Sequence, residues 1–401
     1  MSAPRIGIWL LGARGGVAAT TILGLCALRR GLVGNAGLVT ELPQLAGLGL
    51  AGWDDFEVGG HDIRDISLVD EAMRLAGERA LDGSLVEACR EDLDAIDTEI
   101  RPGTLVNVGE TIENLADNPK SQTAETPRAA VERIQGDLKA FVESKNLDRL
   151  IVVNVASTEP PVDLESLPQT WDELSGTLDS ADDCPLAASS IYAIATLDLG
   201  HAYVNFTPSL GSLPAAICEL ADLRGACHVG RDGKTGETLL KSTLAPMFAA
   251  RNLQVMSWVG HNIFGNMDGV VLNDPANKAT KVDSKDQLLG QIFGYQPQTL
   301  VSIEYIKSLG DWKTAWDHIH FQGFLGTPMT LQFTWQGCDS LLAAPLVLDL
   351  VRLTERAQRA GQTGILCFLS SFFKSPMGVE ENRFAAQFAM LEAWAAEMSA
   401  S

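Results

Sequence analysis

PRIGIWLLGARGGVAATTILGLCALRRGL, residues 4–32, is the stretch that decides the fold. Residues 4–11 form an unbroken apolar run that ends at a glycine, which is typical of a strand buried on both faces of a parallel sheet. The turn that begins at Gly12 leads into a helical pattern, which Gly31 is placed to end. This order of strand, turn and helix predicts the start of an α/β domain.

Helices and strands alternate further along the chain. Residues 67–96 have helical apolar spacing with glycine interruptions, and Ser67 stands where an N-cap is expected. Residues 129–147 predict an amphipathic helix that leads into a buried strand over residues 148–158. Since strand, helix and strand follow in this order, we expect a right-handed crossover and a parallel sheet. The predicted fold class is α/β, with a Rossmann-like, doubly wound parallel sheet.

The second half of the chain is less regular. Residues 160–187 are rich in Pro, Asp and Ser and indicate a surface excursion, whereas residues 191–209 return to an apolar pattern that predicts a strand. A short helix over residues 212–226 and a loop over residues 228–238 follow. Further strands are expected in residues 300–308 and 318–336, and helices in residues 339–361 and 381–398.

Length and charge together predict two domains. The chain has 401 residues, which is more than one core of typical size accommodates. Its formal net charge is −21, yet Lys and Arg balance Asp and Glu between residues 239 and 336. This change in charge marks a boundary. We expect a discontinuous Rossmann-like domain of residues 1–238 and 337–401 and a central α+β domain of residues 239–336.

The composition also argues against several kinds of partner. A strongly acidic chain lacks the broad basic surface that nucleic acids and anionic membranes require. No apolar run is long enough to cross a bilayer, and the N-terminus lacks a signal-peptide pattern. The seven cysteines are scattered and never spaced as C-x-x-C, which indicates reduced thiols. We therefore expect a soluble, cytoplasmic protein.

The glycine-rich turn is the first candidate site. Gly12, Gly15, Gly16 and Val17 lie between the buried strand and the helix, where backbone N–H groups and the helix N-terminus favour a pyrophosphate. A turn without a ligand explains the motif equally well. Asp62 follows a second apolar stretch and is a candidate for the ribose of NAD, although it lies beyond the usual offset of about 20 residues.

A lysine cluster is the second candidate. NDPANKATKVDSK, residues 273–285, spaces Lys278, Lys281 and Lys285 as one helical face in an otherwise acidic protein. Spacing alone favours a solvated face. However, lysines at i,i+4 repel each other unless an anion lies between them, and crowding lowers their pKa values. The role of Lys278 stays open.

Six motifs together carry a resemblance to a known family. The sequence resembles the myo-inositol-1-phosphate synthases, also called inositol-3-phosphate synthases, over nearly the whole chain. The matching segments are HNIFGNMDG (261–269), the pair Lys281 and Lys285, EYIKSLGDWK (304–313), SSFFKSP (370–376), DGKTGETLLKS (232–242) and GCDSLLAAP (337–345).

The resemblance implies a redox-neutral isomerase. Such enzymes use tightly held NAD to oxidise carbon 5 of D-glucose 6-phosphate, which makes the proton on carbon 6 acidic. The enolate closes onto the carbon 1 aldehyde, and reduction of the ring ketone gives 1D-myo-inositol 3-phosphate, or L-myo-inositol 1-phosphate. The resemblance also implies a homotetramer built through the central domain, and it leaves a requirement for a monovalent or divalent cation open.

The resemblance further implies residue roles. Lys281 and Lys374 would act on the reacting oxygens, whereas Lys285 and Lys307 would hold the phosphate and stabilise the enolate. Thr235, Gly236 and Glu237 would cradle the phosphate, and Asn266 and Asp268 would orient the sugar. The residues implied near the cofactor are Ala156, Ser157, Thr158 and Asp232.

The chain departs from the family pattern on the cofactor and phosphate side. Glu237 stands where the family has Gln, and ARGGVAATT (13–21) lacks the family's two asparagines. A cyclase or dehydrogenase for a different phosphorylated sugar and a nucleotide-binding regulatory protein are the alternatives. His318 and His320 would share a strand face, but two histidines without a third ligand are a weak indication of a metal site.

Overall fold

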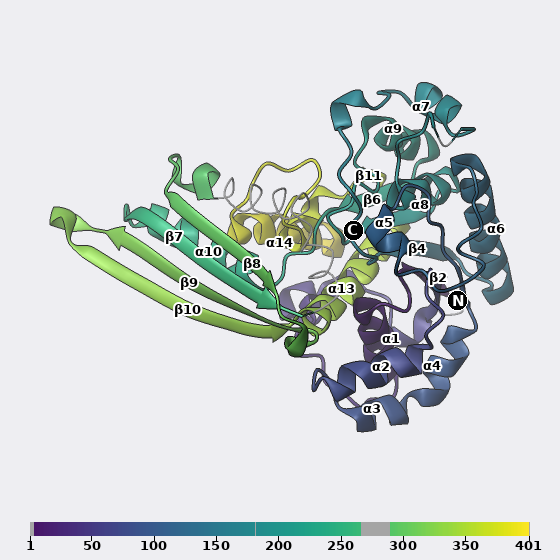
Figure 1. The fold of residues 1–401 in the computed structure, drawn as a ribbon, viewed down its shortest axis with the longest axis horizontal. Coiled ribbons are helices and arrows are strands. Elements are labelled where there is room, and N and C mark those ends of the chain that lie inside the picture. Colours follow the sequence, from purple (N-terminus) through teal and green to yellow (C-terminus); the bar gives the residue numbers. More distant parts are fainter. Residues whose placement is uncertain (1–3, 181, 266–288, 401) are drawn as a thin grey trace.

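The chain folds around two β-sheets, which lie side by side in Figure 1. The structure is a computed structural model that describes residues 4–180, 182–265 and 289–400. A seven-stranded sheet has the strand order β11-β6-β5-β4-β1-β2-β3, and a four-stranded sheet has the order β10-β9-β7-β8. The predicted α/β class and the Rossmann-like sheet are thereby confirmed.

All neighbouring strands of the seven-stranded sheet are parallel. The central strand β1 pairs with β2 on one side and β4 on the other, so the predicted crossover is present. The strands are β1 Ile6–Leu11, β2 Phe56–Asp62, β3 Ile100–Pro102, β4 Arg149–Asn154, β5 Ala202–Asn205, β6 Cys227–Gly230 and β11 Gly364–Ile365.

Side chains of β1 are buried on both faces of this sheet. Ile8 and Leu10 point into a core with α1 (Gly16–Arg29) and α13 (Asp339–Arg359). Trp9 and Leu11 point into a second core on the opposite face. That core includes residues of α6 Pro127–Lys145, α8 Ala188–Asp198 and α9 Ala215–Arg224. The unbroken apolar run of β1 is therefore required by helices on both sides.

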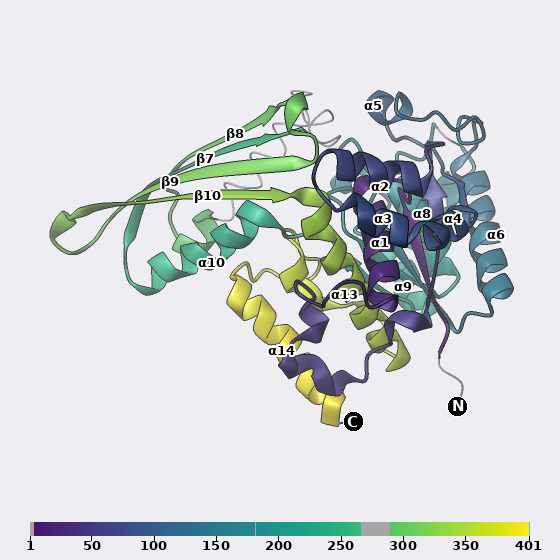
Figure 2. The ribbon, with the colours of Figure 1, turned by 90° about the horizontal axis from the view of Figure 1, so that it is seen from below.

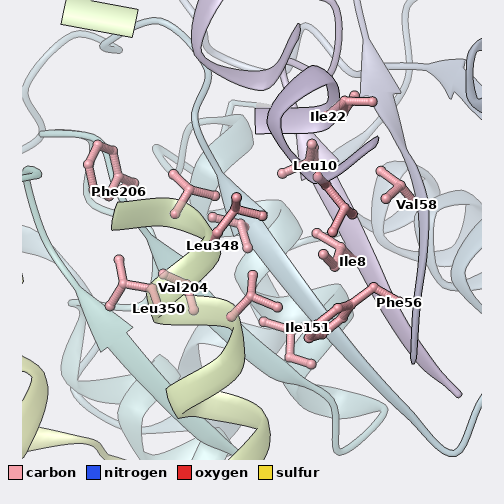
Figure 3. Packing of buried hydrophobic residues seen from close by; sticks show 14 of the residues in the cluster. Ile8, Leu10, Ile22, Phe56, Val58, Ile151, Val204, Phe206, Leu348 and Leu350 are labelled. Carbon is pink, nitrogen blue, oxygen red and sulfur yellow. The ribbon is translucent and has the colours of Figure 1, made fainter. Parts of the chain in front are cut away.

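Helix α13 joins the first core from far along the chain. Figure 3 shows Leu348 and Leu350 of this helix in the same cluster as Ile8, Leu10 and Ile151 of the sheet. The C-terminal part of the chain thus completes a layer that the first strand and helix begin.

The four-stranded sheet projects away from the larger one. Its strands are β7 Gln254–Phe264, β8 Gln298–Tyr305, β9 Trp312–Gln322 and β10 Pro328–Cys338. Helix α10 (Gly236–Ala250) runs along one of its faces (Figure 2), where Phe248 packs against Trp258 and Phe321. The predicted domain boundary after residue 238 falls inside α10, and the division into two domains stays a prediction.

The remaining helices lie around these two sheets. They are α2 Leu68–Gly77, α3 Gly83–Ala88, α4 Arg90–Asp97, α5 Glu110–Glu113, α7 Trp171–Thr177 and α14 Phe384–Ala400. Ser67 caps α2 as predicted, because its side chain accepts a hydrogen bond from the Asp70 backbone N–H. The predictions for α6, β4, α9, α13 and α14 are confirmed as well.

Two segment predictions were wrong. Residues 191–209 were expected to form a strand, but α8 occupies Ala188–Asp198 and only the short strand β5 follows. Helix α8 is buried on nearly all sides, so it shows no polar face and lacks the 3.6-residue period that identifies surface helices. Residues 228–238 were expected to form a loop, but β6 ends at Gly230 and α10 begins at Gly236.

We predict that the packing of α13 against the sheet contributes strongly to stability. Leu348 is 4% exposed, and Leu348→Ala should lower the free energy of unfolding by about 2–5 kcal/mol through lost burial and a residual cavity. Leu223→Ala is the control, since Leu223 is 63% exposed and its truncation should change stability by no more than about 0.5 kcal/mol. Urea unfolding measures both, and equal losses would contradict the expectation.

Candidate active site

A cavity of about 610 Å³ opens where the carboxyl ends of the parallel strands face the four-stranded sheet. Ligands of open α/β sheets bind at this edge, because the loops after successive strands meet there. The loops after β1, β2, β4 and β6 line one part of the cavity. The other part is formed by the ends of β7 and β8 and the beginnings of α10 and α13.

The glycine-rich turn is shaped to lie close to its neighbours. Gly12 has a φ of +77°, and a Cβ atom there would lie 2.8 Å from the Ala156 Cα. A Cβ atom on Gly16 would lie 2.7 Å from the Ser340 Oγ. Gly15, Gly16 and Val17 line the cavity at the first turn of α1, where backbone N–H groups have no partner within the helix. This turn fits the pyrophosphate of a dinucleotide.

Asp62 lies at the end of β2 and holds this turn in place. Its Oδ2 accepts a hydrogen bond from the Arg14 backbone N–H at 2.6 Å, and its Oδ1 accepts one from the Arg64 N–H at 2.8 Å. Burial raises the pKa of Asp62, while the Arg64 charge and these hydrogen bonds oppose the rise. Asp62 lines the cavity as predicted, and its contact with a ribose stays a prediction.

Asp232 and Lys374 meet in the cavity although 142 residues separate them. The Lys374 Nζ donates to the Asp232 Oδ1 at 2.8 Å, and the Lys374 backbone N–H donates to the Asp232 carbonyl oxygen at 2.6 Å. Asp232 has a φ of +62°, in the left-handed region that few non-glycine residues adopt. Burial, together with the charge of Lys374, lowers the pKa of the adjacent Lys234 to about 8.

The structure brings most of the predicted site residues to this one cavity. Thr235, Glu237 and Lys307 line it, as do the predicted cofactor residues Ala156, Ser157 and Thr158. Gly236 begins α10 between two lining residues and is not itself among them. The other predicted residues, Lys281, Lys285, Asn266 and Asp268, lie outside the described residues, as does Lys278.

The sequence analysis missed many of the lining residues, among them Lys313, Asp339, Asn262 and Glu159. Lys313 lies 5.3 Å from the Phe264 ring centroid, and its Nζ is 3.6 Å from the Asp339 Oδ2. Lys313 and Asp339 belong to the quoted motifs EYIKSLGDWK and GCDSLLAAP, so their motifs were found without their roles. Asn262 also lines the cavity and belongs to the quoted motif HNIFGNMDG, whereas Glu159, a further lining residue, lies outside the six quoted motifs.

Glu159 follows the predicted cofactor residues 156–158 and links this segment to α8 through hydrogen bonds. Its carboxylate accepts hydrogen bonds from the Ser189 backbone N–H, at 2.7 Å, and from the Ser189 hydroxyl, at 2.5 Å. The Glu159 backbone N–H donates to the Ser209 Oγ at 3.0 Å. Ser189 lies in the first turn of α8, where a carboxylate is favoured by the helix dipole. Burial nevertheless raises the pKa of Glu159 to about 7, against the opposing effect of these hydrogen bonds.

Two further features concern metals and membranes. His318 and His320 share the face of the four-stranded sheet that points away from α10, as their registers opposite Val259 and Ser257 show. Across residues 4–180, 182–265 and 289–400, no group of three or more His, Cys, Asp or Glu side chains is arranged to hold a metal ion. Within the same ranges, no helix combines the length and apolar character needed to cross a membrane.

The fold and the cavity define a dinucleotide-binding protein of the Rossmann class. A model of the myo-inositol-1-phosphate synthase family, an NAD-binding family, matches residues 6–396. The chain therefore belongs to the myo-inositol-1-phosphate synthase family.

Relatives agree with this assignment, and a solved structure shares the fold. An inositol-3-phosphate synthase of Bacteroides thetaiotaomicron is 32% identical over 396 residues, which cover 93% of this chain and 90% of the relative. The human inositol-3-phosphate synthase 1 is 31% identical, covering 84% of this chain and 62% of its own. The structure of a Caenorhabditis elegans inositol-3-phosphate synthase has a similar fold, with a TM-score of 0.87, 23% identity and coverage of 99% of this chain and 86% of its own.

We predict that Glu159 makes stability depend on pH. Because its pKa is raised from 4.5 to about 7, the folded state binds the proton more tightly than the unfolded state. The contribution of Glu159 to the free energy of unfolding should therefore fall as pH rises between about 4.5 and 7. Glu159→Gln removes this dependence, so its stability relative to the native chain should rise over the same range.

Urea unfolding at several pH values measures this difference. Glu57→Gln is a suitable control, since Glu57 is a partly exposed carboxylate of β2 paired with Arg5 outside the cavity. Parallel curves for the native chain and Glu159→Gln would show that Glu159 does not titrate differently in the two states.

Proposed function

We propose that the chain is an inositol-3-phosphate synthase that converts D-glucose 6-phosphate into 1D-myo-inositol 3-phosphate with NAD and no net redox change. Membership of the family supports the reaction, and the relatives' names give the product. The observation that carries the proposal is the Lys374–Asp232 pair, which shares one cavity with the glycine-rich turn and with Lys307. A dinucleotide and a sugar phosphate would meet beside these cations.

The glycine-rich turn and the first turn of α1 would hold the pyrophosphate of NAD, and Asp62 would keep this turn in shape. When bound, NAD supplies a hydride acceptor that also returns the hydride, which makes the cycle redox-neutral. Ala156, Ser157 and Thr158 would contact the cofactor from the loop that Glu159 anchors. Asp232 would face the reacting end of the cofactor.

The lysines would stabilise the oxyanions that form during the reaction and transfer protons to and from them. Lys374 and Lys281 would move protons at the reacting oxygens, because an ammonium group held within hydrogen-bond reach of an oxygen can donate a proton and later take it back. Lys285 and Lys307 would hold the phosphate and stabilise the enolate, and Lys313 lines the same cavity. Thr235, Gly236 and Glu237 would lie along the phosphate, and Asn266 and Asp268 would orient the sugar. Any cation required would have to be identified by assay.

The reaction can be tested by following inositol phosphate and NADH together after mixing the protein with NAD and glucose 6-phosphate. We expect inositol phosphate without net NADH. Accumulating NADH would identify a dehydrogenase instead, and an inert protein would argue for another sugar phosphate or for a binding role.

Lys374→Ala should lower kcat by about 100-fold or more, since it removes a group placed to transfer protons. Lys139→Ala is the matched control, because Lys139 lies on the exposed face of α6 away from the cavity. Near-normal turnover of Lys374→Ala would refute the proposed role of this lysine.

We also propose a cytoplasmic homotetramer assembled through the four-stranded sheet. Leu300 and Trp316 lie on the face of this sheet opposite α10 and are 54% and 45% exposed. At the β9–β10 turn, Phe324 and Leu325 are 88% and 87% exposed. Apolar side chains gathered in this way are typical of protein interfaces. All seven cysteines lie in the described part of the chain as free thiols, which suits a reducing compartment.

Light scattering should give four times the chain mass for the native protein. Leu300→Asp places a charge on the proposed interface and should shift the population to smaller species. Leu223→Asp, on an exposed position of α9, should not change the mass. A native monomer would refute the proposed assembly.

A further inference from the structure

A buried ion pair lies at the beginning of α10. Glu237 and Lys241 are four residues apart on this helix, and the Lys241 Nζ lies 2.5 Å from the Glu237 Oε1. Their side chains are only 2% and 3% exposed. The Asp317 Oδ1 lies 3.9 Å from the same Nζ and accepts a hydrogen bond from the Trp258 Nε1 at 2.7 Å. These contacts fix the Lys241 ammonium between α10 and the four-stranded sheet.

The backbone of β7 leaves room for this group of charges. A Cβ atom on Gly260 would lie 2.9 Å from the Glu237 Oε1, 3.2 Å from the Asp317 Oδ1 and 3.4 Å from the Lys241 Nζ. A side chain at this place would have to displace the ends of these three charged side chains. The ion pair is therefore built into the junction of helix and sheet.

The ion pair lies directly beside the cavity. Glu237 lines the cavity together with Thr235, the N-cap of α10, and Thr238 in its first turn. Asn262, on the adjacent β7, also lines it, and its buried side-chain amide has no hydrogen-bond partner among the described residues. A buried polar group without a partner in the protein indicates a place for a polar ligand.

A carboxylate at this place has two opposing effects. Negative charge in the first turn of a helix stabilises the helix, because the N-terminus carries partial positive charge. The same charge repels an anion bound at that N-terminus, and the repulsion is strong where water is excluded. Glu237 would therefore weaken a phosphate site unless a nearby cation offsets its charge.

We propose that Lys241 is a positioning residue that cancels the charge of Glu237, so that the first turn of α10 can bind the phosphate group of the substrate. The inference rests on the proposed function for the identity of the sugar phosphate. Lys241 acts through Glu237, since it is not among the residues that line the cavity. The paired Glu237 and Lys241 together carry no net charge, as a neutral side chain at position 237 would. Glu237 is therefore compatible with a phosphate ligand.

Three variants test the proposal with inorganic phosphate as the probe, by titration calorimetry on the NAD-loaded protein. Lys241→Met should raise the Kd for phosphate on the order of 10-fold to 100-fold, because Glu237 loses the ammonium group that lies 2.5 Å from its carboxylate. Glu237→Gln alone should keep or improve the affinity. Glu237→Gln combined with Lys241→Met should recover most of the affinity that Lys241→Met loses.

A purely structural role predicts a different pattern. In that case the double variant would bind phosphate as weakly as Lys241→Met, and this result would overturn the proposal. Loss of phosphate binding in Glu237→Gln, which retains Lys241, would overturn it even if Lys241→Met does not fold. Thermal melting with Lys139→Met as control reports stability separately from affinity.

Kinetic assays of Lys241→Met distinguish the role proposed for Lys241 from the proposed function of the whole protein. If the protein is a synthase, Lys241→Met should raise the KM for glucose 6-phosphate much more than it lowers kcat. If the native protein cyclises glucose 6-phosphate and Lys241→Met raises neither the KM for this substrate nor the Kd for phosphate, the role of Lys241 is refuted and the proposed function stands. If the three variants bind phosphate in the expected order but the native protein does not cyclise glucose 6-phosphate, only the proposed function is refuted.

Discussion

The burial of β1 on both faces is the constraint on which the rest of the structure depends. Its backbone is paired with β2 and β4, and its side chains alternate between two separate cores. All six residues of the strand are buried, and the chain reaches a partly exposed position again at Gly12, just past its carboxyl end. The glycine-rich turn lies at that end, and the loops after β2, β4 and β6 are brought to the same edge by the parallel pairing.

Helix α10 connects this edge to the four-stranded sheet. Its first turn lines the cavity, while Phe248 in its last turns packs against Trp258 and Phe321. One rigid helix thus fixes the distance between the turn suited to a dinucleotide and the strands that complete the cavity. Helix α13 has a similar position, because Asp339 lines the cavity and Leu348 packs beneath the large sheet. The cavity is therefore maintained by the packing of two helices rather than by its loops alone.

The sequence allowed the large sheet and most of its helices to be predicted, because periodicity and capping are local properties. It failed at α8, where burial on nearly all sides removes the polar face that marks a helix. Motif resemblance selected residues that the structure places along one cavity, yet the contact between Asp232 and Lys374 joins segments whose proximity only the fold determines. Glu237 was recognised as a departure, but its pairing with Lys241 was missed because the start of α10 was read as a loop.

The hydrogen bonds of Asp62 also bear on redesign of the cofactor preference. An acidic residue at the end of β2 is the usual target when a dehydrogenase is converted from NAD to NADP. In this chain the same carboxylate accepts the backbone N–H groups of Arg14 and Arg64, one of which belongs to the glycine-rich turn. Exchanging Asp62 would remove two backbone hydrogen bonds, one of which holds the glycine-rich turn in place. A successful redesign would have to supply a new acceptor for the Arg14 N–H. The preference for a cofactor and the shape of the glycine-rich turn therefore cannot be changed independently.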